Sequence, residues 1–436
     1  MINKPKLLKG FRDFRGDELR IRKKIFSIFS EVFESYGYEP LETPTLEYFD
    51  LLMGKYGEEE KLVYQFEDHG KRRVAMKYDL TVPTSRVMAQ YEQELQLPWK
   101  RYQIQPVWRA DNTQKGRFRE FYQLDADVFG VKSVIADTEF IDMGIDIVKN
   151  LGFEKFVVRI NNRKILNAIA KYAGREDKTF DIIYAIDKWD KRSPEETRLD
   201  LIKRLEDPKY SAAELNTQVD KIFECVVLTG SNSEKLDYLK QKLSGITEGE
   251  EGVTELQDIL KFMINKDYFQ YDPTIARGLA YYTGPVWEFQ VIEGGVGSIA
   301  GCGRYDKLVS QFLGREIPAT GGSFGIERII EVMKDRGMLS KFLTTDKKNI
   351  LVALSEDTLP FAYQAADKIR KAGITLMLYP LVQKMGKVID YAVANKYTNM
   401  ILVGENEIRD GIFTLKDLTT REQKTFTLDE LISELK

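Results

Sequence analysis

Arginines at the ends of two expected strands could together bind a phosphate group. In VWRADNTQKGRFREFYQLDADVFG, Arg109 lies at the end of one strand and Arg117 at the start of the next. The ends of an antiparallel pair meet, so these guanidinium groups could converge on one anion with bidentate geometry. Phe121, Gln123 and Asp127 continue the same alternation and share one sheet face, where the ring could stack on a base. The segment therefore predicts a polar, anion-binding pocket, and a solvated basic hairpin is the alternative.

Two further arginines lie in segments that are rich in glycine or aromatic residues. Arg328 in GGSFGIERIIEVM lies just inside an expected helix, whose N-terminus favours anions. An ordinary Glu-Arg pair on a helix surface is the alternative. Arg277 lies near the start of ARGLAYYTGPVWEF, which is typical of a buried strand, and alternation would send Tyr281 and Tyr282 to opposite faces. One tyrosine would then face a cavity, although an edge strand with a solvated arginine explains the same pattern.

A carboxylate and a hydroxyl two positions apart could bind an ammonium group. Asp79 and Thr81 in MKYDLTVP have this spacing, which places both on one face of an extended segment. The alternative is that Asp79 caps the helix expected after it.

Several kinds of site are excluded by what the sequence lacks. His69 is the one histidine and Cys225 and Cys302 are the two cysteines, so a structural zinc site of the usual composition cannot be assembled. His69 reads as an exposed turn residue between two strands, which argues against a Ser-His-Asp triad. No G-x-x-x-x-G-K-[ST] loop is present, and the cluster GGVGSIAGCGRYD does not have dinucleotide-binding spacing. Any phosphate binding must therefore come from arginines.

Composition limits the partners and the compartment. The chain has 65 Lys and Arg against 68 Asp and Glu, a formal net charge of -3, so a nucleic-acid site must be a local patch. No apolar run approaches the ~18 residues of a membrane span, and MINKPKLLKG is no signal peptide. The two distant cysteines fit a reduced compartment. We therefore expect a cytoplasmic protein that contacts no membrane.

Changes in pattern along the chain predict its organisation. Residues 1–163 and 268–336 predict an α+β core built on an antiparallel sheet flanked by helices. Residues 164–267 predict a helical insertion in this core, and residues 337–348 a linker. Residues 349–436 alternate strand and helix in βαβ order, which predicts a small α/β domain with a parallel sheet.

These segments together are similar to the class II aminoacyl-tRNA synthetases, and specifically to the histidyl-tRNA synthetase family. TPTLE, with Pro44, resembles the dimer-forming first motif of the class. RADNTQKGRFREFYQ resembles the second motif and FGIER the third, while RGLAYYTG and AGCGRYD resemble two segments peculiar to the histidine enzymes. The βαβ region resembles their anticodon-binding domain.

The resemblance implies a reaction and its partners. Histidine and ATP, the latter with Mg²⁺, would form histidyl-adenylate and pyrophosphate, and the histidyl group would move to the 3′ end of tRNA(His). The resemblance further implies a homodimer and a helical insertion that helps to hold the acceptor arm. From the residue types present we expect no zinc, and no metal held by protein side chains. Gln114 would lie near the first base pairs of the acceptor stem.

The same resemblance assigns roles around ATP. Arg109 and Arg277 would be the catalytic residues, because Arg109 contacts the α-phosphate and the substrate carboxylate and Arg277 neutralises charge at the attacked phosphate. Arg117 and Arg328 would hold the β- and γ-phosphates. Adenine would pack between Phe121 and Arg328. No side chain need act as a general base, since the substrate carboxylate is already ionised, and positioning with charge carries the catalysis.

It also implies a histidine-binding set: Asp79, Thr81, Gln123, Asp127, Arg277, Tyr281, Tyr282 and Tyr305. The first three would bind the amino group, Asp127 and Tyr282 would hydrogen-bond the imidazole, and Tyr305 would line its pocket. By alternation, Tyr281 would pack the other way.

Three positions depart from the pattern of other family members. Ala280 stands where many have Asp, so any help from that carboxylate is absent. Asp127 stands where others have Glu, so the contact to the imidazole must be re-spaced or made through water. Asp79-Leu80-Thr81 follows one of two family variants.

Three alternative functions share parts of this pattern. A non-charging regulatory paralogue, of the type that serves ATP phosphoribosyltransferase, shares the core and senses histidine, but generally lacks the C-terminal domain. A synthetase for threonine, proline or glycine would pair similar domains, but the threonine enzyme uses zinc ligands that this chain does not have. A tRNA-binding or scaffold module is the third alternative.

Overall fold

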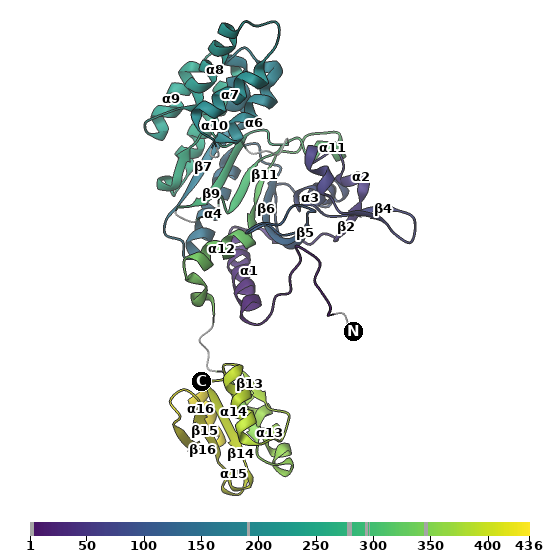
Figure 1. The fold of residues 1–436 in the computed structure, drawn as a ribbon, viewed down its shortest axis with the longest axis vertical. Coiled ribbons are helices and arrows are strands. Elements are labelled where there is room, and N and C mark those ends of the chain that lie inside the picture. Colours follow the sequence, from purple (N-terminus) through teal and green to yellow (C-terminus); the bar gives the residue numbers. More distant parts are fainter. Residues whose placement is uncertain (1–3, 190–191, 277–280, 293–294, 296, 344–347) are drawn as a thin grey trace. The chain divides into compact units, whose positions relative to one another are not determined.

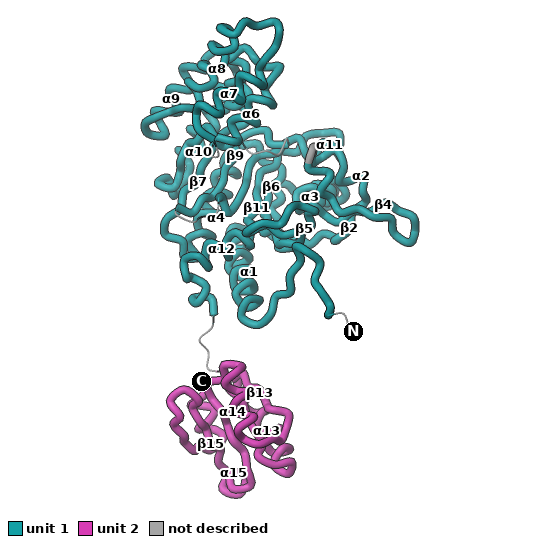
Figure 2. Tube along the Cα trace, viewed as in Figure 1, with its two compact units in different colours: residues 1–343 teal, residues 344–436 magenta. Residues whose placement is uncertain are grey.

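The structure, a computed structural model, describes residues 4–189, 192–276, 281–292, 295, 297–343 and 348–436. The chain divides into two compact units, Met1–Leu343 and Thr344–Lys436, which Figure 2 colours separately. Each unit has its own sheet and its own buried apolar core.

An eight-stranded sheet forms the centre of the first unit (Figure 1). Neighbouring strands are antiparallel except in the two outermost pairs, which are parallel. In spatial order the strands are β1 (Glu39–Pro40), β5 (Trp99–Trp108), β6 (Glu120–Phe129), β11 (Ala319–Gly325), β10 (Ala300–Arg304), β9 (Pro285–Val291), β7 (Phe156–Asn162) and β8 (Phe269–Tyr271). This sheet confirms the α+β core predicted from the sequence.

Helices α1 (Asp17–Ser35), α4 (Ile135–Asn150) and α12 (Ile326–Asp335) pack against the sheet in one continuous core. The even-numbered residues Leu124 and Ala126 of β6 are fully buried in that core. Because side chains alternate along a strand, the odd-numbered residues of β6 face the other side of the sheet. Packing of the even-numbered residues in the core therefore leaves the odd-numbered side chains of β6 available for a binding site.

A three-stranded sheet adjoins this core, in the order β2 (Leu46–Tyr48), β4 (Arg73–Met76) and β3 (Gln65–Glu67). β3 and β4 pair antiparallel around an exposed turn that holds His69, as the sequence predicted. The short elements beside it are α2 (Phe49–Leu52), η1 (Gly57–Leu62), α3 (Thr81–Gln90) and α11 (Ser310–Leu313).

Among the described residues, six α-helices separate β7 from β8 in the chain and gather at one end of the unit (Figure 1). They are α5 (Arg163–Tyr172), α6 (Thr179–Asp187), α7 (Pro194–Leu205), α8 (Ala212–Val226), α9 (Asn232–Lys242) and α10 (Thr247–Phe262). Serines cap α7, α8 and α9 at their N-termini, each in a capping box with a glutamate three residues on. Their apolar sides close into the same buried cluster as the sheet.

The second unit holds a five-stranded sheet, in the order β13 (Leu376–Leu378), β12 (Asn349–Ala353), β14 (Asn399–Val403), β15 (Phe413–Asp417) and β16 (Gln423–Phe426). The first three are parallel and are linked by α13 (Leu359–Lys371) and α14 (Met385–Ala394), as βαβ order predicts. The parallel arrangement predicted for these three strands is confirmed, and two further strands that the sequence pattern did not predict, β15 and β16, run antiparallel. The link between those two strands is too short for a crossover helix, so only a hairpin is possible. Two short helices, α15 (Glu405–Asp410) and α16 (Leu428–Leu435), complete the unit.

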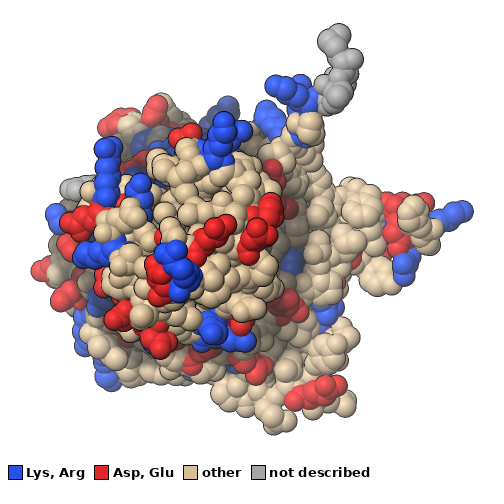
Figure 3. Space-filling view, turned by 90° about the horizontal axis from the view of Figure 1, so that it is seen from below, with Lys and Arg blue, Asp and Glu red and all other residues tan. Residues whose placement is uncertain are grey.

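No helix among the described residues is long and apolar enough to cross a membrane. On the face that Figure 3 shows, Lys and Arg are interspersed with Asp and Glu. This mixture agrees with the small net charge of -3.

Candidate active site

Strands β5 and β6 present a polar face opposite the apolar core. The register places Arg101 opposite Asp127, Gln103 opposite Asp125 and Gln105 opposite Gln123. All these residues are odd-numbered, so they lie on the face that the core leaves free. The sequence had predicted this face from Phe121, Gln123 and Asp127 together with Arg117 and Arg119, but β6 begins only at Glu120.

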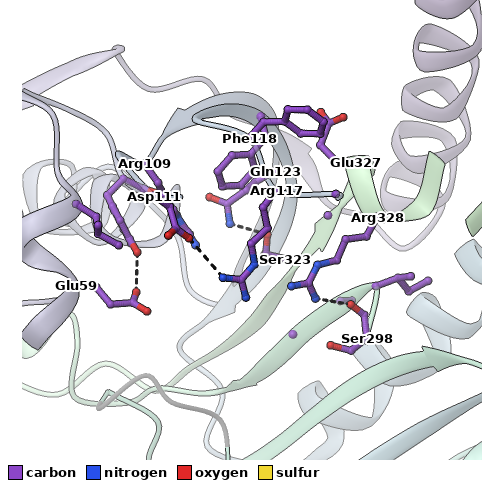
Figure 4. Close-up of a pocket in the computed structure, with 18 residues that line it drawn as sticks. Glu59, Arg109, Asp111, Arg117, Phe118, Gln123, Ser298, Ser323, Glu327 and Arg328 are labelled. Carbon is purple, nitrogen blue, oxygen red and sulfur yellow. Dashed lines mark hydrogen bonds and ion pairs between the residues drawn. The ribbon is translucent and has the colours of Figure 1, made fainter. Parts of the chain in front are cut away.

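Arginines line a cavity of about 260 Å³ at the end of this hairpin. Arg109, Arg117, Phe121, Gln123 and Arg328 all border it, so the structure brings together every described residue that was assigned to ATP. In Figure 4 the guanidinium groups of Arg117 and Arg328 point into the same space. An anion held between two such groups would receive charge-assisted hydrogen bonds from both.

Each of these arginines is oriented by a contact with another residue that lines the cavity. Arg109 donates from Nε to the Tyr78 carbonyl at 3.0 Å, and its guanidinium lies 4.3 Å from the centre of the Tyr78 ring. Arg117 lies 3.4 Å from Asp111, and Arg328 donates to the Ser298 carbonyl at 2.7 Å (Figure 4). Such contacts limit side-chain freedom before a ligand arrives, which lowers the entropy cost of binding.

A second cavity, of about 50 Å³, adjoins the first and shares Arg109 and Gln123 with it. It is lined by carboxylates, tyrosines and the glycine-rich strands β10 and β11. The expected histidine-binding residues that border it are Asp79, Thr81, Gln123, Asp127, Tyr281, Tyr282 and Tyr305. Gln123 donates to Ser323 at 2.7 Å, and its buried Oε1 accepts no hydrogen bond within the described part of the chain. That oxygen is therefore a ready acceptor for an ammonium group.

Asp79 lies at the start of α3 and has two structural partners. Its Oδ1 accepts from the backbone N–H of Val82 at 3.1 Å and from the Tyr56 hydroxyl at 3.0 Å. The helix-capping alternative is therefore what the structure shows, and the carboxylate borders the cavity at the same time. Burial raises the pKa of Asp79, while Arg109 opposes that shift. Thr81 is the first residue of the helix rather than part of a strand.

The prediction that Tyr281 packs away from the site is wrong. Tyr281 and Tyr282 both border the small cavity, with ring centres 4.9 Å apart, and Tyr281 also contacts the Tyr305 ring at 5.8 Å. Strand β9 begins only at Pro285, so the two tyrosines lie in an irregular segment. The alternation rule for strands does not apply there, and both rings can turn to one side.

Asp127 forms the floor of the small cavity and has two buried partners, Arg101 and Tyr305. Arg101 pairs with its Oδ2, and the Tyr305 hydroxyl donates to its Oδ1. Burial raises the pKa of Asp127, and the Arg101 charge and the Tyr305 hydrogen bond oppose the rise. Burial also raises the pKa of Tyr305 well above its ordinary value, so the hydroxyl stays a donor.

Sequence reasoning missed the buried polar residues below this floor. Arg101 and Gln103 are fully buried, Asp125 is 1 % exposed, and Lys77 donates to Gln105 at 2.9 Å. Burial raises the pKa of Asp125 to about 8 and lowers that of Lys77 to about 8. The signal was present: RYQIQ in β5 alternates polar residues with the same period as QLDAD in β6.

The predicted tRNA residue Gln114 lies in the loop between β5 and β6. It pairs with Arg117 through the backbone in an isolated bridge. It also borders a broad depression of about 1180 Å³ that continues from the arginine cavity toward Asp187 and Lys188 of the helical segment.

Arg277 and Ala280 lie outside the described residues. No group of three or more potential ligands for a metal ion occurs among the described residues.

The N-terminal segment adds another arginine beside the site. Arg12 lies 2.7 Å from Glu327, the neighbour of Arg328, and its guanidinium is 3.2 Å from the ring centre of Phe118, the neighbour of Arg117. Arg22 of α1 contacts Glu327 with both of its terminal nitrogens, at 2.9 and 3.1 Å. One carboxylate thus ties the start of α12 to two segments far away in the sequence.

Known proteins match the chain over its full length. The family model "Histidyl-tRNA synthetase" matches residues 10–329, and "Anticodon binding domain" matches residues 348–436. The chain is 39% identical to a histidine–tRNA ligase of Phocaeicola vulgatus, over 100% of both chains. The crystal structure of histidyl-tRNA synthetase from Nostoc sp. PCC 7120 superposes with a TM-score of 0.83 and 28% identity, covering 100% of this chain and 99% of that one.

A more distant likeness concerns the fold alone. An ATP phosphoribosyltransferase regulatory subunit/histidyl-tRNA synthetase from Bacillus halodurans C gives a TM-score of 0.74 at 22% identity, over 93% of this chain and 98% of that one. The family model covers well over half of the chain, and the relative from Phocaeicola vulgatus aligns from end to end. The chain belongs to the histidyl-tRNA synthetase family.

Proposed function

We propose that the chain activates histidine with ATP and transfers the histidyl group to tRNA(His). One observation carries the proposal: an arginine-lined cavity and a smaller, acidic and aromatic cavity adjoin and share Arg109 and Gln123. The larger cavity suits the phosphates and the base of ATP. The smaller one suits an amino acid whose side chain can donate a hydrogen bond.

In the first step, an oxygen of the histidine carboxylate attacks the α-phosphorus of ATP. The new bond gives histidyl-adenylate, and the bond to the β-phosphate oxygen breaks to release pyrophosphate. Arg109, at the junction of the two cavities, would hold the carboxylate and the α-phosphate in contact. Arg117 and Arg328 would receive the departing phosphates, with Mg²⁺ entering as part of the substrate. Arg277 would supply further positive charge at the attacked phosphate.

The histidine would be held at both of its ends. Asp79 and the free Oε1 of Gln123 accept from its ammonium group, helped by the Thr81 hydroxyl. Asp127 and Tyr282 bind the imidazole, with Tyr281 and Tyr305 as walls. Electrostatic preorganisation of this kind typically supplies several kcal/mol of transition-state stabilisation.

In the second step, a terminal ribose hydroxyl of the tRNA attacks the histidyl carbonyl and AMP leaves. Gln114 borders the broad depression through which the acceptor end would enter. The helical segment 164–267 would support the acceptor arm, and residues 349–436, joined through a linker at 337–348, would bind the anticodon. We further propose a homodimer that acts in the cytoplasm.

Histidine-dependent exchange of labelled pyrophosphate into ATP tests the first step. We expect exchange with histidine and not with the other nineteen amino acids, and charging of tRNA(His) when that tRNA is added. Tight histidine binding without any exchange would contradict the proposal and indicate a regulatory paralogue. Exchange with a different amino acid would point to another class II synthetase.

A further inference from the structure

Among the described residues, Arg101 is the most deeply buried cation near the small cavity. Its side chain is 0 % exposed, and β5 holds it directly opposite Asp127 of β6. An arginine so buried is always charged, so it needs a negative partner. Its ion-pair partner is Asp127, the carboxylate at the floor of the cavity.

Asp127 itself has little freedom to move. The Tyr305 hydroxyl donates to one carboxylate oxygen and Arg101 lies at the other. On the β11 side the carboxylate packs against Gly321, where a Cβ would stand 2.1 Å from Oδ1. The carboxylate therefore keeps one orientation, with its remaining lone pairs available to the cavity.

The net charge of the Arg101–Asp127 ion pair decides whether a cationic or a neutral ligand binds at Asp127. A lone buried carboxylate would attract a cation strongly, whereas a carboxylate already paired with arginine has no net charge to offer. A second cation brought to Asp127 would also lie close to the Arg101 guanidinium and be repelled. A neutral N–H donor meets neither problem.

The other titratable groups around Asp127 do not change this balance. Asp79 at the start of α3 is engaged by Tyr56 and by the helix, and would receive the substrate ammonium. Asp125 of β6 has a pKa raised to about 8 by burial, which keeps it mostly protonated at neutral pH. Burial also raises the pKa values of Tyr38 and Tyr305, so both remain neutral.

We propose that Arg101 is a positioning and specificity residue that makes the pocket bind the neutral imidazole of histidine and reject the imidazolium. Asp127 accepts a hydrogen bond from the imidazole N–H, and Arg101 holds that carboxylate ionised and in place. This inference rests on the proposed histidine-activating function.

The first test uses the wild-type chain and two substrates. Pyrophosphate exchange is measured from pH 5.5 to 8.5 with histidine and with 2-fluorohistidine, whose ring stays neutral throughout. We expect kcat/KM for histidine, divided by that for 2-fluorohistidine, to fall about tenfold for each pH unit below ~6.5, where free imidazole protonates. A ratio that stays flat or rises on acidification would overturn the proposal without any variant.

The second test compares Arg101→Met and Arg101→Lys with a matched control. Arg175→Met removes another fully buried arginine, one that pairs with Asp177 in the helical segment. We expect Arg101→Met to raise KM for histidine by roughly 10- to 100-fold, with KM for ATP changed less than about twofold. In Arg101→Met, kcat/KM for histidine divided by kcat/KM for 2-fluorohistidine should no longer fall at low pH. Arg101→Lys keeps a positive charge and should retain most of the wild-type behaviour.

The outcomes separate this inference from the proposed function. Equal changes in KM for histidine and ATP, or a wild-type pH ratio in folded Arg101→Met, would overturn the role of Arg101 while leaving histidine activation intact. If Arg101→Met does not fold, the wild-type pH comparison still tests whether the pocket binds the neutral imidazole and rejects the imidazolium. Absence of exchange with every amino acid would instead remove the proposed function.

Discussion

Tyr305 and Asp127 both line the small cavity that we propose binds histidine, and the Tyr305 hydroxyl links them. The hydroxyl donates to Asp127, and the ring packs edge-on against Phe129 and Tyr281. Removing the hydroxyl leaves the packing but removes one partner of a buried carboxylate. Tyr305 is therefore a sharp probe of the expected imidazole site.

We predict that Tyr305→Phe raises KM for histidine about fivefold to tenfold and leaves KM for ATP unchanged, since one such hydrogen bond is worth ~1 kcal/mol. Steady-state pyrophosphate exchange would measure both constants. Tyr271→Phe is the control, because this fully buried hydroxyl has no hydrogen-bond partner within the described part of the chain. Equal effects of the two substitutions would refute the prediction.

Asp125 links the pocket floor to the pH dependence of folding. Burial raises its pKa from 3.8 to about 8 in the folded chain, so between these values the unfolded chain has already released a proton that the folded chain keeps. The unfolded state then binds fewer protons, and stability must fall as pH rises through this window. A neutral amide at this position has no such dependence.

We compare the free energy of unfolding of Asp125→Asn with that of the wild type. We predict that this difference shifts in favour of the variant by about 1–3 kcal/mol as the pH rises from 5 to 8. Urea unfolding followed by tryptophan fluorescence suits this measurement, because Trp99, Trp108, Trp189 and Trp287 all lie in the first unit. A difference that is the same at both pH values would show that Asp125 is ionised in the folded chain.

At the scale of elements, the segment before α1 supports two arginines of the larger cavity at once, Arg117 and Arg328, which we propose bind ATP. Arg12 contacts Glu327 beside Arg328 and the ring of Phe118 beside Arg117. The Gly10 carbonyl also accepts from the backbone N–H of Arg119 at 2.9 Å. The loop between β5 and β6 and the start of α12 are thus held by one segment.

We predict that Arg12→Ala raises KM for ATP about threefold to tenfold, with a smaller change in KM for histidine. The partly exposed ion pair and the cation–π contact together are worth ~1 kcal/mol. Arg15→Ala is the matched control, since Arg15 is exposed in the same segment. The result that contradicts this role is a loss of ATP affinity in the control as large as in Arg12→Ala.

Regular elements were predictable from the sequence where one periodicity governs many residues. The β5–β6 hairpin is the clearest case, because alternation alone placed Phe121, Gln123 and Asp127 on one face. The segment around Tyr281 and Tyr282 was not predictable in this way, since an irregular backbone has no periodicity to read. The pairing of Arg101 with Asp127 was missed for another reason: it depends on register between strands, and only the register shows which polar residues meet.

At the scale of the whole molecule, the two compact units suggest separable tasks. Both adjoining cavities are lined entirely by residues of Met1–Leu343. Thr344–Lys436 has its own buried core, which includes Leu351, Ile401 and Phe413. Histidine activation should therefore depend on the first unit, whereas recognition of the whole tRNA should need both.

We predict that a chain ending at Leu343 retains pyrophosphate exchange within about threefold of the full chain but loses about 100-fold or more in kcat/KM for charging tRNA(His), because one of two linked binding modules is gone. Measuring both reactions on one preparation makes the activation assay an internal control for folding. Charging that survives truncation would mean that the acceptor end alone, read near Gln114 and the helical segment, identifies the tRNA. Loss of both reactions together, in a chain whose tryptophan fluorescence remains native, would mean that the second unit contributes to activation itself.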